Sequence, residues 1–167
     1  EVWGVKADAD GIREFGENLT SEIEQISAQI YEYAGKEFNI SSPKQLGQVL
    51  FEDLKLPVKK KTKSGYSTDA QTLEEIRHLS PIIDDILEYR QVTKLHSTYT
   101  EALVRAADEN HRVHTDFKQA LTATGRLSSA EPNLQNIPVK TELGREMRRF
   151  FTAGKEDLVL IDADYSQ

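Results

Sequence analysis

Apolar residues recur every three or four positions from Ile12 to Tyr33, which is the clearest periodic pattern in the chain. The stripe consists of Ile12, Phe15, Leu19, Ile23, Ile26, Ile30 and Tyr33. This spacing predicts one amphipathic helix of about six turns that buries a single face. Gly35 stands where a glycine commonly ends a helix, so we expect the helix to stop there. We interpret it as a packing helix.

Two Ser-Pro pairs predict the starts of two further helices. In each pair the serine side chain can cap the helix, and the proline suits its first turn. The first helix begins at Ser42, where Gln45 completes a capping box, and ends before Pro57. The second begins at Ser80 and runs to about Ala107.

The helix that begins at Ser80 has two different faces. Its apolar face consists of Ile82, Ile86, Tyr89, Val92, Tyr99 and Leu103. The neighbouring stripe begins with Ile83 and Leu87 and changes to Arg90, Lys94 and Ser97 at the same spacing. We therefore expect a long antiparallel helical hairpin whose second helix is buried on one stripe and turns cationic on the next.

A basic segment separates the two long helices. Lys59-Lys60-Lys61-Thr62-Lys63 lies within residues 58–67, which are too rich in turn-forming residues for regular structure. Thr68 with Gln71 forms another capping box, which predicts a short helix to about Leu79. A basic tip between capped helices suits contact with phosphate oxygens, whereas composition alone favours a solvated loop.

Beyond Arg112 the pattern alternates, as in a strand, and a short strand is also expected over residues 2–7. Residues 141–146 are expected to form one helical turn, and residues 148–151 to be extended. The apolar run 158–161 predicts a buried strand that leads into Asp162-Ala163-Asp164-Tyr165-Ser166-Gln167.

Residues 122–138 are dense in side chains that donate hydrogen bonds and poor in side chains that fill a core. They read Thr-Ala-Thr-Gly-Arg-Leu-Ser-Ser-Ala-Glu-Pro-Asn-Leu-Gln-Asn-Ile-Pro. Gly125 and the two prolines favour turns, and such a segment is costly to bury. We expect it to face water or a polar ligand.

Composition excludes several classes of protein. The chain lacks cysteine, so disulfides and cysteine-based zinc sites are excluded, and no apolar run is long enough to span a membrane. These features suit a cytoplasmic protein. The net charge of −7 argues mildly against non-specific binding to nucleic acid, but the positive charge is concentrated in the lysine segment. His111 and His114 lack a third ligand at convincing spacing, so we interpret them as surface residues.

The donor-rich segment and the terminal Asp-Tyr-Ser-Gln, in this order and about thirty residues apart, resemble the family A DNA polymerases. The similarity extends back through residues 38–46, and the uninterrupted spacing looks most like the bacterial repair and primer-removal enzymes of that family. The resemblance implies an α+β fold that is mostly helical. Residues 1–110 would form the thumb with its basic tip at 58–68, strand 2–7 packing on the palm. Residues 111–167 would be the first part of the palm and end inside the first catalytic motif.

The resemblance also implies a set of DNA-binding residues. They are Lys60, Lys61, Lys63, Ser67, Thr68, Arg90, Lys94, Thr124, Arg126, Asn133, Gln135, Asn136 and Lys140. The minor groove presents acceptors at similar places on every base pair, so Arg and amide donors could sense pair geometry without reading sequence. Lys140 stands where relatives often have Arg, which keeps the charge but loses the bidentate fork.

Asp164 matches the family's first catalytic carboxylate. The resemblance implies that Asp164 and the backbone carbonyl of Tyr165 bind Mg²⁺, of which the intact enzyme uses two ions for transfer to a primer 3'-hydroxyl. The second catalytic aspartate and the residues that bind the triphosphate do not occur in these 167 residues. We therefore expect the chain alone to bind no Mg²⁺ and to be inactive. The family usually has a small or neutral residue at Asp162, so no catalytic role is carried onto it.

The implied function is DNA-directed DNA polymerase in replication and repair, with primer–template DNA and deoxynucleoside triphosphates as partners of a monomeric bacterial, cytoplasmic enzyme without membrane association. The main alternative is a non-catalytic duplex-DNA-binding module that reuses the thumb. A third interpretation, an acidic helical interaction protein, gives no reason for Arg126 and the amide cluster.

Overall fold

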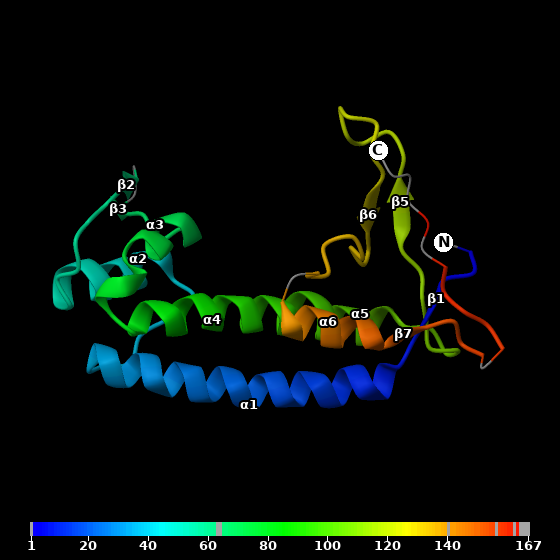
Figure 1. Ribbon diagram of the computed structural model, residues 1–167, viewed down its shortest axis with the longest axis horizontal. Helices are drawn as coiled ribbons and strands as arrows, with labels where there is room; N and C mark the ends of the chain where they lie inside the picture. Colours follow the sequence, from blue (N-terminus) through cyan, green and yellow to red (C-terminus); the bar gives the residue numbers. More distant parts are fainter. Residues whose placement is uncertain (1, 63–64, 140, 156, 162, 164–167) are drawn as a thin grey trace. The chain divides into compact units, whose positions relative to one another are not determined.

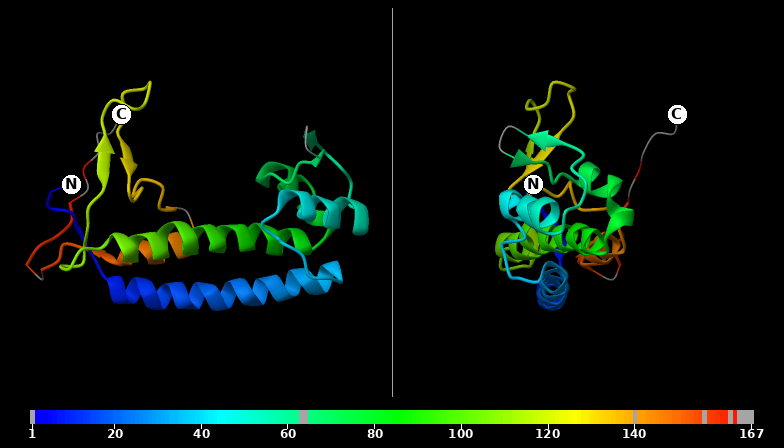
Figure 2. Two further views of the ribbon diagram at one scale, coloured as in Figure 1. Left: turned by 180° about the vertical axis from the view of Figure 1, so that it is seen from behind. Right: turned by 90° about the vertical axis from the view of Figure 1, so that its left-hand side faces the viewer.

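The computed structural model describes residues 2–62, 65–139, 141–155, 157–161 and 163. The chain divides into two compact units, which are described separately (Figures 1 and 2). Unit 1 comprises Glu1–Glu17 and Leu95–Gln167, and unit 2 comprises Asn18–Lys94. The first long helix therefore contributes residues to both units.

Unit 2 is built on a pair of antiparallel helices. Helix α1 spans Ala9–Ala34 and helix α4 spans Ile82–Leu95, and their unit 2 parts lie side by side in Figures 1 and 2. Their buried side chains in this unit are Leu19, Ile26, Ile30, Ile82, Ile83, Ile86 and Val92. Gly35 ends α1 with φ +68°, the left-handed conformation predicted for a C-terminal cap.

Short elements complete unit 2. They are α2 (Pro43–Gln48), the π-helical turn η1 (Val49–Asp53), β2 (Lys61–Thr62), β3 (Gly65–Tyr66), α3 (Ala70–Glu75) and the 3-10 turn η2 (Arg77–Leu79). Ser42 caps α2 as predicted, because its side chain accepts from the Gln45 backbone N–H. The cap of α3 was predicted one residue early: Asp69, not Thr68, accepts from the Thr72 N–H at 2.7 Å. The basic segment also differs from the prediction, since β2 and β3 pair as a short antiparallel hairpin.

Unit 1 combines helix with sheet. The π-helical turn η3 (His96–Thr100) continues into α5 (Glu101–Ala106). Strands β1 (Val5–Ala7), β4 (Arg112–Val113) and β7 (Phe151–Thr152) form an antiparallel sheet in the order β4-β1-β7. Strands β5 (Asp116–Lys118) and β6 (Ser128–Ala130) form a separate antiparallel pair. The mixture of helices and small antiparallel sheets confirms the α+β class.

Two local predictions in unit 1 were wrong. Residues 148 and 149 belong to helix α6 (Glu142–Arg149), which Thr141 caps by accepting from Gly144 N–H at 3.1 Å, so only 151–152 is extended. Residues 158–161 are exposed and not a strand. Within the described residues no strand pairs with this run, and an apolar pattern cannot form a strand without a partner.

Asp108 closes the turn between α5 and β4. Its Oδ1 accepts from the backbone N–H groups of Asn110 and Arg112, each at 2.8 Å. Its Oδ2 lies 3.0 Å from Nε2 of His114. The Arg112 N–H and His114 lower the pKa of the Asp108 carboxyl, which holds it ionised. His114, interpreted from the sequence as a surface residue, thus takes part in closing this turn.

Candidate nucleic-acid interface

Residues 118–128 turn the chain between β5 and β6. Gly125 has φ +74°, a conformation that side chains disfavour. Thr122 Oγ1 donates to the Arg126 carbonyl at 2.6 Å and closes the turn. Thr124 and Arg126 are exposed, and no hydrogen bond or ion pair from the described residues engages the Arg126 guanidinium. The tip therefore presents a cationic side chain on a fixed turn.

Buried hydroxyl groups organise the second half of the donor-rich segment. Thr115 Oγ1 and Ser129 Oγ are 2.6 Å apart and both residues are buried. Thr115 Oγ1 also donates to the Pro132 carbonyl at 2.8 Å, and Ser129 Oγ accepts from the Leu134 N–H at 2.9 Å. These contacts satisfy the Pro132 carbonyl and the Leu134 N–H, close to the cis peptide bond between Glu131 and Pro132.

Gln135 uses both ends of its amide inside this segment. Its Oε1 accepts from the Ser129 N–H at 3.0 Å, and its Nε2 donates to the Leu127 carbonyl at 3.2 Å. The sequence prediction assigned Gln135 to DNA. In the DNA-free chain it instead braces β6 against residues 133–136.

The two asparagines differ in how they are held. Asn133 Oδ1 accepts from the Gln135 N–H at 3.0 Å, a local turn. Asn136 is exposed, and its backbone carbonyl accepts from the hydroxyl of buried Tyr99 in η3. Residue 144 of α6 must be glycine, because a Cβ there would lie 2.3 Å from the Pro138 carbonyl oxygen. The segment is thus anchored to two helices.

The second set of predicted DNA-binding residues lies in unit 2. Lys59, Lys60 and Lys61 are exposed, whereas Ser67 and Thr68 are buried. Lys60 Nζ lies 3.3 Å from Asp69 Oδ2, and Lys61 Nζ lies 5.9 Å from the centroid of the Tyr66 ring. Lys94 is exposed on α4.

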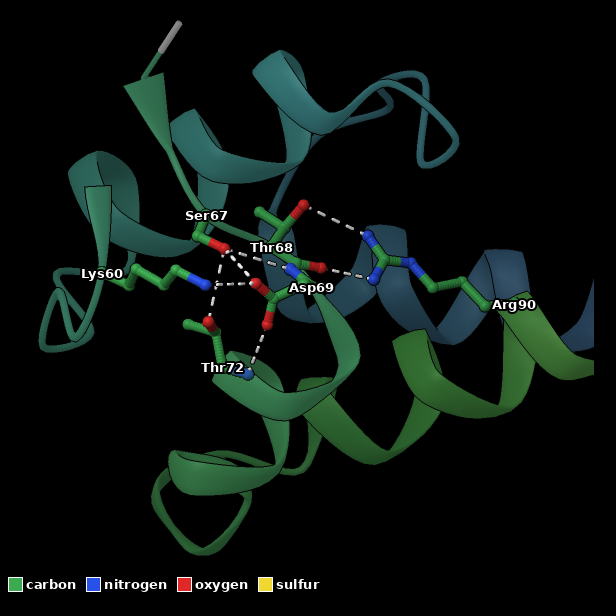
Figure 3. A network of polar contacts seen from close by, with 6 residues as sticks. All are labelled: Lys60, Ser67, Thr68, Asp69, Thr72 and Arg90. Atoms are coloured by element: carbon green, nitrogen blue, oxygen red, sulfur yellow. Dashed lines mark hydrogen bonds and ion pairs between the residues drawn. The ribbon is translucent and has the colours of Figure 1, made fainter. Parts of the chain in front are cut away.

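Asp69 is the centre of the polar network in Figure 3. Its Oδ1 accepts from the Thr72 N–H, and its Oδ2 accepts from Ser67 Oγ at 2.7 Å and from Lys60. These donors lower the pKa of the Asp69 carboxyl, the Thr72 backbone N–H contributing most. Sequence reasoning missed Asp69, although an Asp three residues before Thr72 at a helix start is itself a capping signal.

The remaining predicted site residues are Lys63, Lys140, Asp164 and Tyr165, and they lie outside the described residues, as does Asp162. The described part of the chain contains no group of three His, Asp or Glu side chains that could hold a metal ion. It also contains no helix of the length and apolarity that spanning a membrane requires.

Comparison with known proteins identifies the family. The family described as DNA polymerase family A matches residues 9–167. The chain is 51% identical over its whole length to DNA polymerase I of Bacillus subtilis and 52% identical to that of Geobacillus stearothermophilus, and it spans 19% of each of these relatives. Among solved structures, the POL domain of Pol1 from M. smegmatis, in complex with DNA primer-template and dNTP, is 40% identical with a TM-score of 0.84. That similarity covers 89% of this chain and 26% of the solved chain. The chain therefore belongs to DNA polymerase family A.

Proposed function

We propose that the chain is the DNA-gripping part of a template-directed DNA polymerase. Residues 1–110 are proposed as the thumb, with the basic tip at 58–68, and residues 111–167 as the first part of the palm. In the intact enzyme this part holds primer–template duplex while deoxynucleotides are added to the primer 3'-hydroxyl. A monomeric enzyme of the bacterial cytoplasm is part of the same proposal.

The proposal is supported by a difference among the side chains of residues 122–138, some of which bond inside the segment while others are exposed. Ser129 and Gln135 use their polar groups inside the segment, which fixes its shape. Arg126 and Asn136 remain exposed on that shape. Exposed donors carried on a fixed backbone suit minor-groove acceptors, which occupy similar positions at every base pair. A polymerase needs contacts of this kind, since it must bind every sequence.

The proposed metal ligands follow from the sequence motif at residues 164–167. Asp164 and the Tyr165 carbonyl would hold Mg²⁺, which when bound supplies Lewis-acid stabilisation of the transferring phosphoryl group. The chain's own contribution is to hold and orient the duplex. We expect the 167 residues alone to extend no primer with Mg²⁺ and deoxynucleotides, and steady incorporation by the pure chain would contradict this.

The test uses a chimaera in which the chain replaces its matching stretch of Bacillus subtilis DNA polymerase I. Duplex binding is measured with a fluorescent primer–template for the chimaera, for Arg126→Ala, and for Arg105→Ala as a control, because Arg105 is an exposed arginine of α5. We expect Arg126→Ala to lose about 1–3 kcal/mol of binding free energy, the scale of a good base contact. Equal binding by the two variants, or no binding by the chimaera, would contradict the proposal.

A further inference from the structure

Arg90 joins the end of the basic segment to helix α4. Its Nη1 donates to the Thr68 carbonyl at 2.5 Å, and its Nη2 donates to Thr68 Oγ1 at 3.3 Å, as Figure 3 shows. Arg90 is half-buried, and this desolvation lowers the pKa of its guanidinium, while the charge of Asp69 acts in the opposite direction. The fork of the guanidinium is therefore directed at a buried residue of its own chain.

Two other attachments hold the same segment. The Tyr66 ring packs against Phe51 of η1, with centroids 5.1 Å apart, and a Cβ at Gly47 would lie 3.1 Å from Tyr66 Cβ. Asp69 connects the segment to α3, because its carboxylate accepts from the Thr72 N–H of that helix and from Lys60 of the segment. Three successive parts of the segment are thus bound to three different elements of unit 2.

We propose that Arg90 is a positioning residue for the lysine segment and not itself a phosphate contact. By holding Thr68, it fixes the conformation in which Lys59, Lys60 and Lys61 are exposed. The backbone that carries these lysines is therefore already ordered before they contact nucleic-acid phosphates. This rests on the proposed function, because that function supplies the phosphate partner.

The physical gain is a lower ordering cost on binding. Ordering a flexible segment and its long side chains costs free energy that is subtracted from affinity. A segment already held in the free protein avoids most of that cost. Ordering cost does not depend on salt, whereas release of counterions from phosphates does. The two possible roles of Arg90 therefore give different salt dependences.

The test compares Arg90→Ala, Arg90→Lys and Lys94→Ala. Lys94 is an exposed cation one turn further along α4, so Lys94→Ala removes the same charge without touching Thr68. Amide hydrogen exchange of residues 65–72 is measured in the DNA-free 167-residue chain. We expect both Arg90 variants to speed exchange by about fivefold or more, on the scale of a lost charged hydrogen bond, and Lys94→Ala to leave it unchanged.

The second measurement is duplex binding by the chimaeric polymerase over a range of salt concentrations. For Arg90→Ala we expect weaker binding at every salt concentration with an unchanged log–log slope. Arg90→Lys should not restore affinity, because a lysine ammonium cannot reproduce the fork. A slope lower by about 0.9, or rescue by lysine, would identify a direct phosphate contact and overturn the proposal.

The two measurements separate the two proposals. Unchanged exchange in both Arg90 variants, with normal binding by the wild-type chimaera, would overturn the positioning role alone. Absence of duplex binding by the wild-type chimaera would overturn the proposed function and with it the phosphate partner. Faster exchange in the Arg90 variants would then still establish that Arg90 holds Thr68.

Discussion

The hydroxyl of Tyr99 donates a hydrogen bond to the backbone carbonyl of Asn136, a residue 37 positions away in the chain. Tyr99 is buried in η3, and Asn136 lies in the donor-rich segment. The contact attaches Asn136, which is proposed to face the minor groove, to a buried side chain of η3.

Tyr99→Phe tests this connection. The ring remains and only the hydroxyl is lost, so the Asn136 carbonyl loses its donor. We expect a loss of about 0.5–1.5 kcal/mol in unfolding free energy, measured by urea denaturation of the 167-residue chain. Tyr33→Phe is the control, because Tyr33 is 48% exposed and should change stability little. Equal stability of the two variants would contradict the role of the Tyr99 hydroxyl.

Gln135→Glu tests the brace between β6 and the following residues. The variant keeps an acceptor for the Ser129 N–H but replaces the donor to the Leu127 carbonyl with a second acceptor. We expect faster amide exchange at Leu127 and Ser129 in the absence of DNA. Asn133→Asp is a matched change two residues earlier that preserves its single acceptor contact, and it should leave these amides unaffected. Protection unaltered in Gln135→Glu would refute the brace.

The pH dependence of stability tests the Asp108 turn. The folded-state pKa of Asp108 is lowered, chiefly by the Arg112 N–H and His114. Its contribution is therefore present in full above the ordinary pKa of about 3.9 and is lost as the pH falls through the lower folded-state value. We expect Asp108→Asn to be less stable than wild type at pH 7, with the difference shrinking below about pH 4. A difference that is constant down to pH 2 in urea titrations would contradict this.

Lys61→Gln tests phosphate binding by the basic segment. Removal of one phosphate contact should lower the log–log salt slope of duplex binding by the chimaera by about 0.9, with equal effect on different DNA sequences. Lys36→Gln is the control, because Lys36 is paired with Asp53 at 2.6 Å in the same unit. An effect of Lys61→Gln confined to one sequence would argue against a backbone contact.

Asp164→Ala separates a polymerase from a duplex-binding module. In the chimaera we expect primer extension to be abolished and duplex binding to be retained. A metal ligand takes part in the transfer reaction and not in binding of the duplex. Extension assays with Mg²⁺, beside binding at the same salt concentration, measure both. Retained extension would remove Asp164 from the proposed catalytic site.

The sequence predicted the long elements well and the connections less well. Periodic apolar residues set α1 and α4, because burying one stripe dominates the energetics of a long helix. Arg148 and Arg149 were predicted to be extended, but the Thr141 cap begins helix α6, which includes both residues and ends at Arg149. A threonine at a helix start is a local capping signal, which the prediction did not use for residues 148 and 149.

The location of the candidate site stays a prediction from the sequence, whereas the structure shows which of its side chains are already used inside the protein. Residues 122–138 were recognised as a polar surface from composition and family motif. The family resemblance placed Gln135 and Arg90 among the expected DNA-binding residues. Whether a donor is already used inside the protein depends on partners such as Leu127 and Thr68, which are 8 and 22 positions away. Spacing along a helix or strand does not reveal those partners.

The π-helical turn η3 lets the surrounding helix hold one residue more than a regular α-helix would. A π turn contains one more residue than an α turn, so the helix accommodates an extra residue between Leu95 and Glu101. Leu95 and Leu103 are both buried, and they are eight positions apart in the chain. Deleting Ser97 would close a regular α turn and leave them seven positions apart, which is about two α-helical turns, so they would stay on one side. A single-codon deletion in η3 would therefore be tolerated better than a deletion in a regular α-helical turn, which rotates every later residue by about 100°.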